Sequence, residues 1–424
     1  MSAGLDRAAF VRVGAAATLA GGLGLRAPAA AAGRAKRLLG PRDVRLLGAF
    51  RMPTDVKGLD AAWGNGLALR RVGGRIRLFS LTVKGELYEV ALPQLRARPP
   101  YREAALVRLW GDVYGGRRLL DPPASRGNGV IGLHWDEPGR RLYWTYGDGY
   151  NTVSARDPFL GASLLDDKAG TARALGPWRL RGRSVKMCLG GLLSVPQPFA
   201  DRWCRGRRLA AGFGGYFSIA TVGPVSMGPA LAAFSPDALQ PDGGTVDQTA
   251  LVGYPFNAEP YTQPGRARRD PGYRTEFDGW NPKDGIGYWS WTDYLAQAGV
   301  WIDTPAVEGV LFLPTMGVGR TWYEASTLRA ENAAHWWFVY DPADLARVAS
   351  GLRKQWQIQP RRFWRVRVPG LPDPLPGWAD SPRNLVTGAV FDHASSRLYV
   401  AVRFGTGPEL GDSHLVLVYG VARR

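Results

Sequence analysis

One spacing occurs twice in the chain and constrains its fold more than any other feature. Residues 130–136 and 387–392 each form a β-rich run that ends in aspartate, and each run is followed, after four residues, by Arg-Leu-Tyr. An aspartate at a strand end caps a tight turn, and successive residues of a strand point to opposite faces. The spacing therefore predicts two hairpins of the same geometry. It also predicts turn roles for Asp136 and Asp392, which makes both poor catalytic candidates.

Short runs of this kind alternate with turn signals along most of the chain. A further hairpin is predicted from residues 75–81 and 87–92. Glycine accounts for 55 of 424 residues and proline for 32. The glycine share is nearly twice the usual ~7%, and long amphipathic helices are hard to find against that background. The pattern is typical of an all-β sandwich, barrel or propeller.

A second element recurs, in which a strand runs into a proline-containing turn. It occurs at residues 233–239 and 338–345, and more weakly at 87–95. We interpret it as an outer strand followed by the crossing to the next sheet. Such strands recur at gaps of roughly 75 residues, long for a unit of about 45, with one longer interval. Their ends fall near Leu92, Leu165, Phe234, Tyr340 and Tyr419.

With these hairpins and this cadence, the chain resembles the β-propeller superfamily, and its blade length is similar to that of secreted five-bladed propellers. The resemblance implies a single all-β propeller domain over residues 40–424. We expect five blades, and six or seven are the alternatives if residues 243–309 contain another. Residues 44–50 are expected to complete the last blade, because an open ring leaves two unpaired sheet edges. The alternation at residues 365–368 predicts an outer strand whose arginines face water.

The first 32 residues have the order of a cleavable export signal. Positive charge is followed by an uncharged apolar run at residues 13–25 and by small residues at 27–32. The run is too short for a membrane helix, which needs about 20 apolar residues. Residues 6–12 resemble a twin-arginine signal in which Ala8 replaces the second arginine. We therefore predict a bacterial-type secreted or periplasmic protein without a membrane span, exported by the twin-arginine or the general secretory route.

The formal net charge of +18 favours polyanionic partners. For an exported protein these are anionic glycans or other surface polymers, and a nucleic-acid partner is not expected. Only seven of the 54 basic residues are lysine. The alternative origin of the charge is therefore the arginine-rich codon usage of a GC-rich genome, and we give this the larger share.

The two cysteines and four histidines do not form a recognisable metal or redox motif. Cys188 and Cys204 are interpreted as a disulfide that closes a short loop, since an exported protein can keep one. Two free, buried thiols are the alternative. The histidines are scattered without the spacing of a zinc site. No cofactor and no metal are predicted.

The richest candidate site is residues 273–294, where carboxylates stand among tryptophans. Tryptophan faces stack on sugar rings, and carboxylates bind hydroxyls. The predicted ligand-binding residues at the channel mouth are Asn65, Asn128, Trp280, Trp289 and Trp291. A glycoside hydrolase needs two carboxylates about 5–10 Å apart, and the candidates are Asp60, Glu276 and Asp293. The alternative is that the tryptophans fill the space between blades, and that the acids and Asn-Gly pairs lie in turns.

These observations leave three functions open. We predict an exported propeller that binds a ligand, a glycan, at the mouth of its channel. One alternative is a carbohydrate-active enzyme of the glycoside hydrolase kind on a five-bladed propeller. The other is a surface interaction scaffold that has no small-molecule site.

Overall fold

The structure, a computed structural model, describes residues 36–61, 66–82, 84–114, 129–147, 158–183, 188, 190–213, 229–253, 298–324, 327–368, 371, 384–403, 405 and 414–423. The predicted export signal lies outside these ranges. Within them, no helix is both long enough and apolar enough to cross a membrane.

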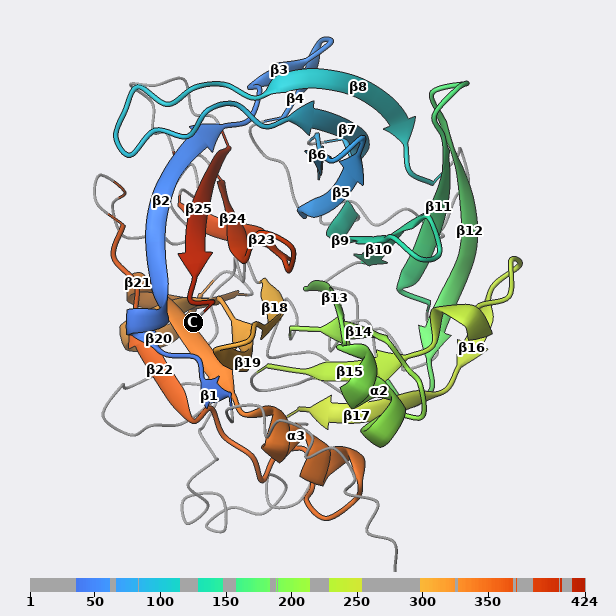
Figure 1. The fold of residues 1–424 in the computed structure, drawn as a ribbon, viewed down its shortest axis with the longest axis vertical. Helices are drawn as coiled ribbons and strands as arrows, with labels where there is room; N and C mark the ends of the chain where they lie inside the picture. The colour runs from blue at the N-terminus through green and yellow to red at the C-terminus, as the bar shows by residue number, and fades with distance from the viewer. Residues whose placement is uncertain are drawn as a thin grey trace, which may run out of the picture. The chain divides into compact units, whose positions relative to one another are not determined.

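Five sheets of four or more strands surround a common centre as the blades of a propeller (Figure 1). This confirms the predicted fold class and blade number. Blade 1 contains β5 (Ala68–Val72), β6 (Arg75–Leu81), β7 (Glu86–Ala91) and β8 (Ala105–Asp112). Blade 2 contains β9 (Gly129–Asp136), β10 (Arg141–Gly147), β11 (Leu160–Asp166) and β12 (Thr171–Leu180). Blade 3 contains β13 (Gly191–Ser194), β14 (Leu209–Gly212), β15 (Leu231–Phe234) and β17 (Gln248–Val252).

The last two blades are built in the same way, with additions. Blade 4 contains β18 (Gly299–Asp303), β19 (Val307–Phe312), β21 (Thr327–Tyr340) and β22 (Arg362–Arg365). Blade 5 contains β23 (Leu385–Asp392), β24 (Arg397–Arg403), β25 (Leu415–Val421) and β2 (Val44–Arg51). The remaining strands are β1 (Arg37–Leu38), β3 (Asp55–Val56), β4 (Leu59–Asp60), β16 (Gly244–Val246) and β20 (Thr315–Glu324), which pairs with β21.

The innermost strands form a closed circle of contacts. Around the centre, β5 contacts β9, β9 contacts β13, β13 contacts β18, β18 contacts β23, and β23 returns to β5. In the described part of residues 243–309, the strands β16, β17, β18 and the start of β19 belong to blades 2, 3 and 4. They do not form a sixth blade.

The N-terminal strand closes the ring, as predicted. β2 pairs antiparallel with β25 from Val44 opposite Val421 to Arg51 opposite Leu415. The outermost strand of blade 5 is thus supplied by the start of the domain. Backbone hydrogen bonds replace the open edge that β25 would otherwise have.

The core consists of five apolar clusters, one at each junction between neighbouring blades. The repeated Arg-Leu-Tyr motif explains how one strand serves two junctions. In β10, Leu142 packs at the junction with blade 1 and Tyr143 at the junction with blade 3. In β24, Leu398 and Tyr399 divide in the same way between blades 4 and 1. The predicted hairpins β9–β10 and β23–β24 are confirmed, and in both cases they are the first two strands of a blade.

Two interpretations of the repeats need correction. The hairpin β6–β7 exists, but it joins the second and third strands of its blade and is not equivalent to the other two. The proline turn after a third strand leads to the fourth strand of the same blade and not to the next blade. Thus β15 is followed by the short β16, which pairs with β12 at the edge of blade 2, and then by β17, whereas β21 is followed by the helix α3 (Pro342–Ala349) and then β22. A third strand still has an unpaired edge, which the fourth strand pairs. The predicted strand ends mark the five third strands, so they count the blades correctly.

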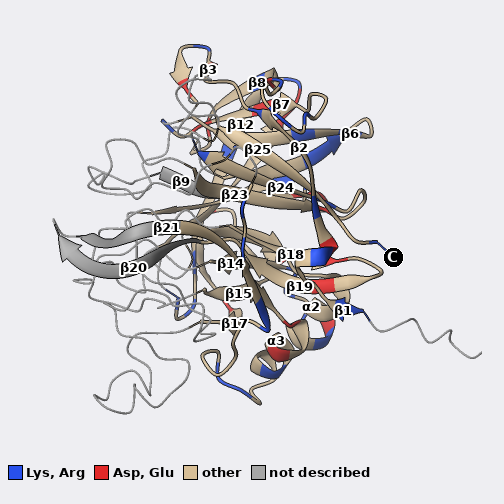
Figure 2. Ribbon diagram, turned by 90° about the vertical axis from the view of Figure 1, so that its left-hand side faces the viewer, with Lys and Arg blue, Asp and Glu red and all other residues tan. Residues whose placement is uncertain are grey.

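Charge on the outside of the blades is dispersed. Arg365 and Arg367 are exposed whereas Val368 is buried, which confirms the predicted alternation, although β22 ends at Arg365. Lysine and arginine occur on several blades of the described structure and do not gather on one (Figure 2).

Both cysteines are free thiols in the structure, which corresponds to the second of the two alternatives. Cys188 packs in the cluster between blades 2 and 3, and Cys204 in the cluster between blades 3 and 4. Burial raises the pKa of each thiol to about 12. Buried, protonated thiols of this kind are unreactive.

Thiol titration tests this arrangement. The native protein should react slowly with an aromatic disulfide reagent because both thiols are buried and protonated. After denaturation without a reductant, two thiols per chain should react at once, as in a fully reduced control. If the denatured, unreduced chain released no thiol, the two cysteines would be joined as a disulfide.

A glycine at the centre of the ring provides a second test. A Cβ atom at Gly132 of β9 would lie 2.3 Å from the Cα atom of Gly191 of β13, where backbone cannot give way. We expect Gly132→Ala to lower the free energy of unfolding by about 2–3 kcal/mol. The control is Gly420→Ala, whose Cβ would first meet the exposed side chain of Leu47 at 3.3 Å. Equal stabilities of the two variants in urea would contradict the close approach of β9 and β13.

Candidate functional site

A cavity of about 420 Å³ lies at the centre of the ring, and all five innermost strands contribute to its wall. The residues that line it include the ends of β9 and β23 and the turns that follow them. Its apolar wall includes Leu69, Leu192, Val195, Val300 and Val390. Its polar and charged lining residues are Arg70, Arg71, His134, Asp136, Glu137, Ser194, Gln197, Arg208, Asp392 and His393.

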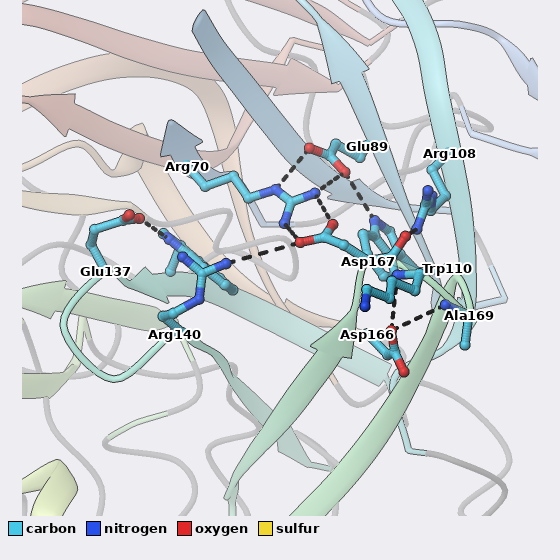
Figure 3. Close-up of polar contacts among 11 residues, drawn as sticks. Arg70, Glu89, Arg108, Trp110, Glu137, Arg140, Asp166, Asp167 and Ala169 are labelled. Carbon is cyan, nitrogen blue, oxygen red and sulfur yellow. Dashed lines mark hydrogen bonds and ion pairs between the residues drawn. The ribbon is translucent and has the colours of Figure 1, made fainter. Parts of the chain in front are cut away.

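Arg70 is buried and hydrogen-bonded to two carboxylates. Its Nε and Nη2 donate to the carboxylate of Glu89 at 2.8 and 2.7 Å, and Nη2 also donates to Asp167 at 2.9 Å (Figure 3). The side chains of Arg70 and Glu89 are only 6% and 1% exposed. Burial alone would lower the pKa of Arg70, but its hydrogen bonds to the carboxylates of Glu89 and Asp167 outweigh this effect, and the pKa is raised. Arg70 is therefore a fixed cation that joins blade 1 to blade 2.

Aromatic rings also pack around the guanidinium group of Arg70. Its guanidinium carbon lies 5.2 Å from the ring centroid of Phe79 and 5.3 Å from that of Trp110. Trp110 in turn donates through Nε1 to Glu89 at 3.2 Å (Figure 3). Such stacking accompanies the charge–charge contact and fixes the plane of the guanidinium group.

The two repeated hairpin aspartates also join neighbouring blades. Asp136 accepts a hydrogen bond from the backbone N–H of Gly139 at 3.1 Å and forms an ion pair with Arg208 of blade 3. Asp392 accepts from the N–H of Ala394 at 3.2 Å and pairs with Arg71 of blade 1 at 2.5 Å. The predicted turn role is confirmed for both aspartates, and each has this second role as well.

The charges that line the cavity are equal in number. The lining has three arginines, Arg70, Arg71 and Arg208, and three acids, Asp136, Glu137 and Asp392. Arg71 and Arg208 pair with two of these acids, and Arg70 pairs with Glu89. A site with paired charges exerts little net field on an ion. It therefore suits a neutral ligand better than an anion.

His134 and Ser194 form an uncharged polar pair in the lining of the same cavity. The Nε2 atom of His134 lies 3.0 Å from the hydroxyl oxygen of Ser194. The two strands approach closely two or three residues earlier, at Gly132 and Gly191. His134 keeps some contact with solvent but is surrounded by protein atoms. This burial lowers its pKa to about 4, with Asp136 opposing the shift and Arg208 adding to it. The imidazole is therefore neutral at pH 7 and hydrogen-bonds as an uncharged group.

Of the predicted catalytic and ligand-binding residues, only Asp60 lies in the described structure, and it does not line this cavity. Asp60 lies exposed in β4, opposite Asp55 in the small β3–β4 ribbon, and lines none of the described cavities. The other predicted residues lie outside the described ranges: Asn65, Asn128, Glu276, Trp280, Trp289, Trp291 and Asp293. Among the described side chains, no three of His, Cys, Asp and Glu cluster as a metal site would require.

One sequence signal for the observed cavity was missed. Glu89 interrupts an otherwise apolar and aromatic strand, and a charge in a buried strand requires a partner of opposite sign. The adjacent arginines 70 and 71, just before a Gly-Gly turn, were candidates for that partner. The convergence of Ser194 with His134 had no local signal, because their strands lie in different blades.

Comparisons with known proteins find only weak structural similarities. No family model matches the chain, and no curated protein matches its sequence. Two solved structures of glucose dehydrogenase are similar at 11% identity and a TM-score of 0.34, covering 89% and 88% of this chain and 99% and 98% of theirs. Raptor from Chaetomium thermophilum is similar at 10% identity and a TM-score of 0.32, over 87% of this chain and 24% of its own. Similarities this weak do not indicate a function.

The low pKa of His134 predicts a pH dependence of stability. The unfolded chain takes up a proton on this residue near pH 6.5, whereas the folded chain takes it up only near pH 4. The free energy of unfolding should therefore fall as the pH drops from 6.5 to 4. In His134→Gln, the slope of the unfolding free energy against pH should decrease by the equivalent of up to one proton. Urea unfolding at several pH values measures this slope.

The matched control is Ser194→Ala, which removes the hydrogen-bond partner but leaves the imidazole buried. It should keep the wild-type slope. If His134→Gln also kept the full slope, the folded and unfolded states would not differ in the protonation of His134.

Proposed function

We propose that the protein is an exported propeller that binds a small, neutral, hydroxyl-bearing ligand, a sugar unit of a glycan, in the central cavity. The observation that carries the proposal is the cavity itself, which is lined by all five innermost strands and has balanced charge. Export is inferred from the first 32 residues alone.

The size and lining of the cavity support this ligand class. Small-molecule sites enclose about 300–1,000 Å³ and combine apolar walls with a few polar groups. At about 420 Å³, the cavity has room for one or two sugar rings. Leu192, Val195 and Val300 would contact the apolar faces of a ring. Trp135 and Trp301 are themselves 7% and 3% exposed, so they support the wall and offer little face for stacking.

The polar groups match hydroxyls better than they match ions. Ser194, Glu137 and Gln197 are exposed at the cavity, and together they offer a hydroxyl, a carboxylate and an amide oxygen. Neutral His134 hydrogen-bonds with Ser194, which orients the serine hydroxyl. A sugar hydroxyl both donates and accepts, so it can pair with any of these groups.

Calorimetry or saturation-transfer NMR with a panel of sugars tests the proposal. Neutral mono- and disaccharides should bind, and the corresponding uronic acids should bind more weakly, because the paired arginines leave no free cation. Ser194→Trp should abolish binding by filling the cavity. Ser194→Ala should weaken binding about fivefold through the lost hydrogen bond.

The control is Ser350→Trp, which adds the same bulk at an exposed position after α3. It should bind sugars as the wild type does. Absence of sugar binding, or equal effects of the two tryptophan variants, would refute the proposal. The glycoside hydrolase alternative, with Asp60, Glu276 and Asp293, stays a prediction that assays with chromogenic glycosides can address.

A further inference from the structure

A second concave site lies beside the outermost strand of blade 3 and shares no lining residue with the central cavity. Its volume is about 360 Å³. Three arginines line it, Arg181, Arg205 and Arg207, together with one acid, Asp247. The remaining wall comes from Trp203 at the end of α2 (Gln197–Trp203), from β17 and from the C-terminal end of α3.

Local backbone structure brings these four charged residues together. β12 and β16 pair in parallel, with Leu180 opposite Val246, so the next residues, Arg181 and Asp247, also face each other. Their side chains form an ion pair at 2.7 Å. After α2 the chain turns sharply, with positive φ angles of 56° at Arg205 and 76° at Gly206. This turn directs the chain towards β14 and places Arg205 and Arg207 at the same pocket.

The positive charge of this pocket is not compensated. The Arg181–Asp247 pair accounts for the single acid, and the Nη1 atom of Arg207 donates to the neutral hydroxyl of Thr249 at 2.8 Å. Among the residues that the structure describes, neither Arg205 nor Arg207 forms an ion pair. The site therefore carries three cations against one anion, in contrast to the balanced central cavity.

The pKa of Asp247 reflects the positive charge around it. A hydrogen bond from Arg181 is the largest cause that lowers the pKa of Asp247, and the charges of Arg207 and Arg205 lower it further. All three arginines therefore act on the same carboxylate, that of Asp247. A concave site with charges of one sign concentrates counter-ions within it.

We infer that this pocket binds a phosphate or sulfate group. Guanidinium groups present planar forks of donors that match the oxygens of such groups, and the resulting charge-assisted hydrogen bonds are strong. Arg205 and Arg207 provide the uncompensated donors, while Trp203 provides an apolar wall beside them. The group is either a free ion or an ester on a polysaccharide. The site is independent of the proposed sugar site.

The experiment measures the binding of inorganic phosphate and pyrophosphate by calorimetry at low salt, and of dextran sulfate against neutral dextran. Arg205→Gln and Arg207→Gln should each weaken anion binding about fivefold to tenfold. Asp247→Asn should strengthen it about twofold to fivefold, because it removes the one opposing charge. Binding should weaken as salt is raised.

The matched control is Arg367→Gln, which removes the same charge from an exposed position in blade 4. It should bind anions as the wild type does, and all variants should retain the wild-type thermal melt. Arg207→Lys keeps the charge and should retain part of the affinity, which separates loss of charge from misfolding.

Each outcome supports or overturns the inference. Binding of inorganic phosphate identifies a free-ion site, whereas binding of dextran sulfate alone identifies an ester on a polymer. The inference is overturned if no anion binds, if the variants at 205 and 207 behave as Arg367→Gln does, or if Asp247→Asn does not bind more tightly. None of these results bears on neutral sugars, so the two sites are tested separately.

Discussion

The pairing of β2 with β25 is the constraint on which the rest of the structure depends. Each blade buries both of its faces against neighbours, so the five apolar clusters exist only when every blade has two neighbours. The pairing from Val44 to Arg51 completes blade 5 and lets it pack on blade 1. Only then do the five innermost strands meet in a circle and leave the cavity between them.

Besides this apolar packing, charged contacts fix the position of each blade relative to its neighbour. Arg71 with Asp392, Arg70 with Asp167, and Arg208 with Asp136 each cross a junction between neighbouring blades. These ion pairs are partly buried and lose hydration, so they contribute less to stability than their contacts suggest. Their effect here is geometric, because each fixes one blade against the next. They also leave the cavity electrically balanced, whereas Arg205 and Arg207 beside blade 3 form no ion pair among the described residues.

The fold was readable from the sequence where its signals are local. The Asp-to-Arg-Leu-Tyr spacing encodes a turn and two faces within a dozen residues, and so predicted both first-to-second-strand hairpins. The strand-then-proline cadence counted the blades, but it could not show that the chain returns to the same blade, because that depends on which edge is unpaired. The cavity could not be predicted, because Ser194 and His134 meet only through the ring. The tryptophan-rich residues 273–294 lie outside the described structure.

The ring closure also sets the order of folding events. β2 is made before all five innermost strands, whereas its partner β25 follows the other four blades along the chain. Until β25 is made, the residues of β2 that pair with it have no partner strand, although Ala49 and Arg51 also hydrogen-bond with residues 96–104. The ring therefore closes only after the other four blades have been made, and cutting the chain between two other blades while linking the two ends of the domain would preserve every junction but change which strand has to wait.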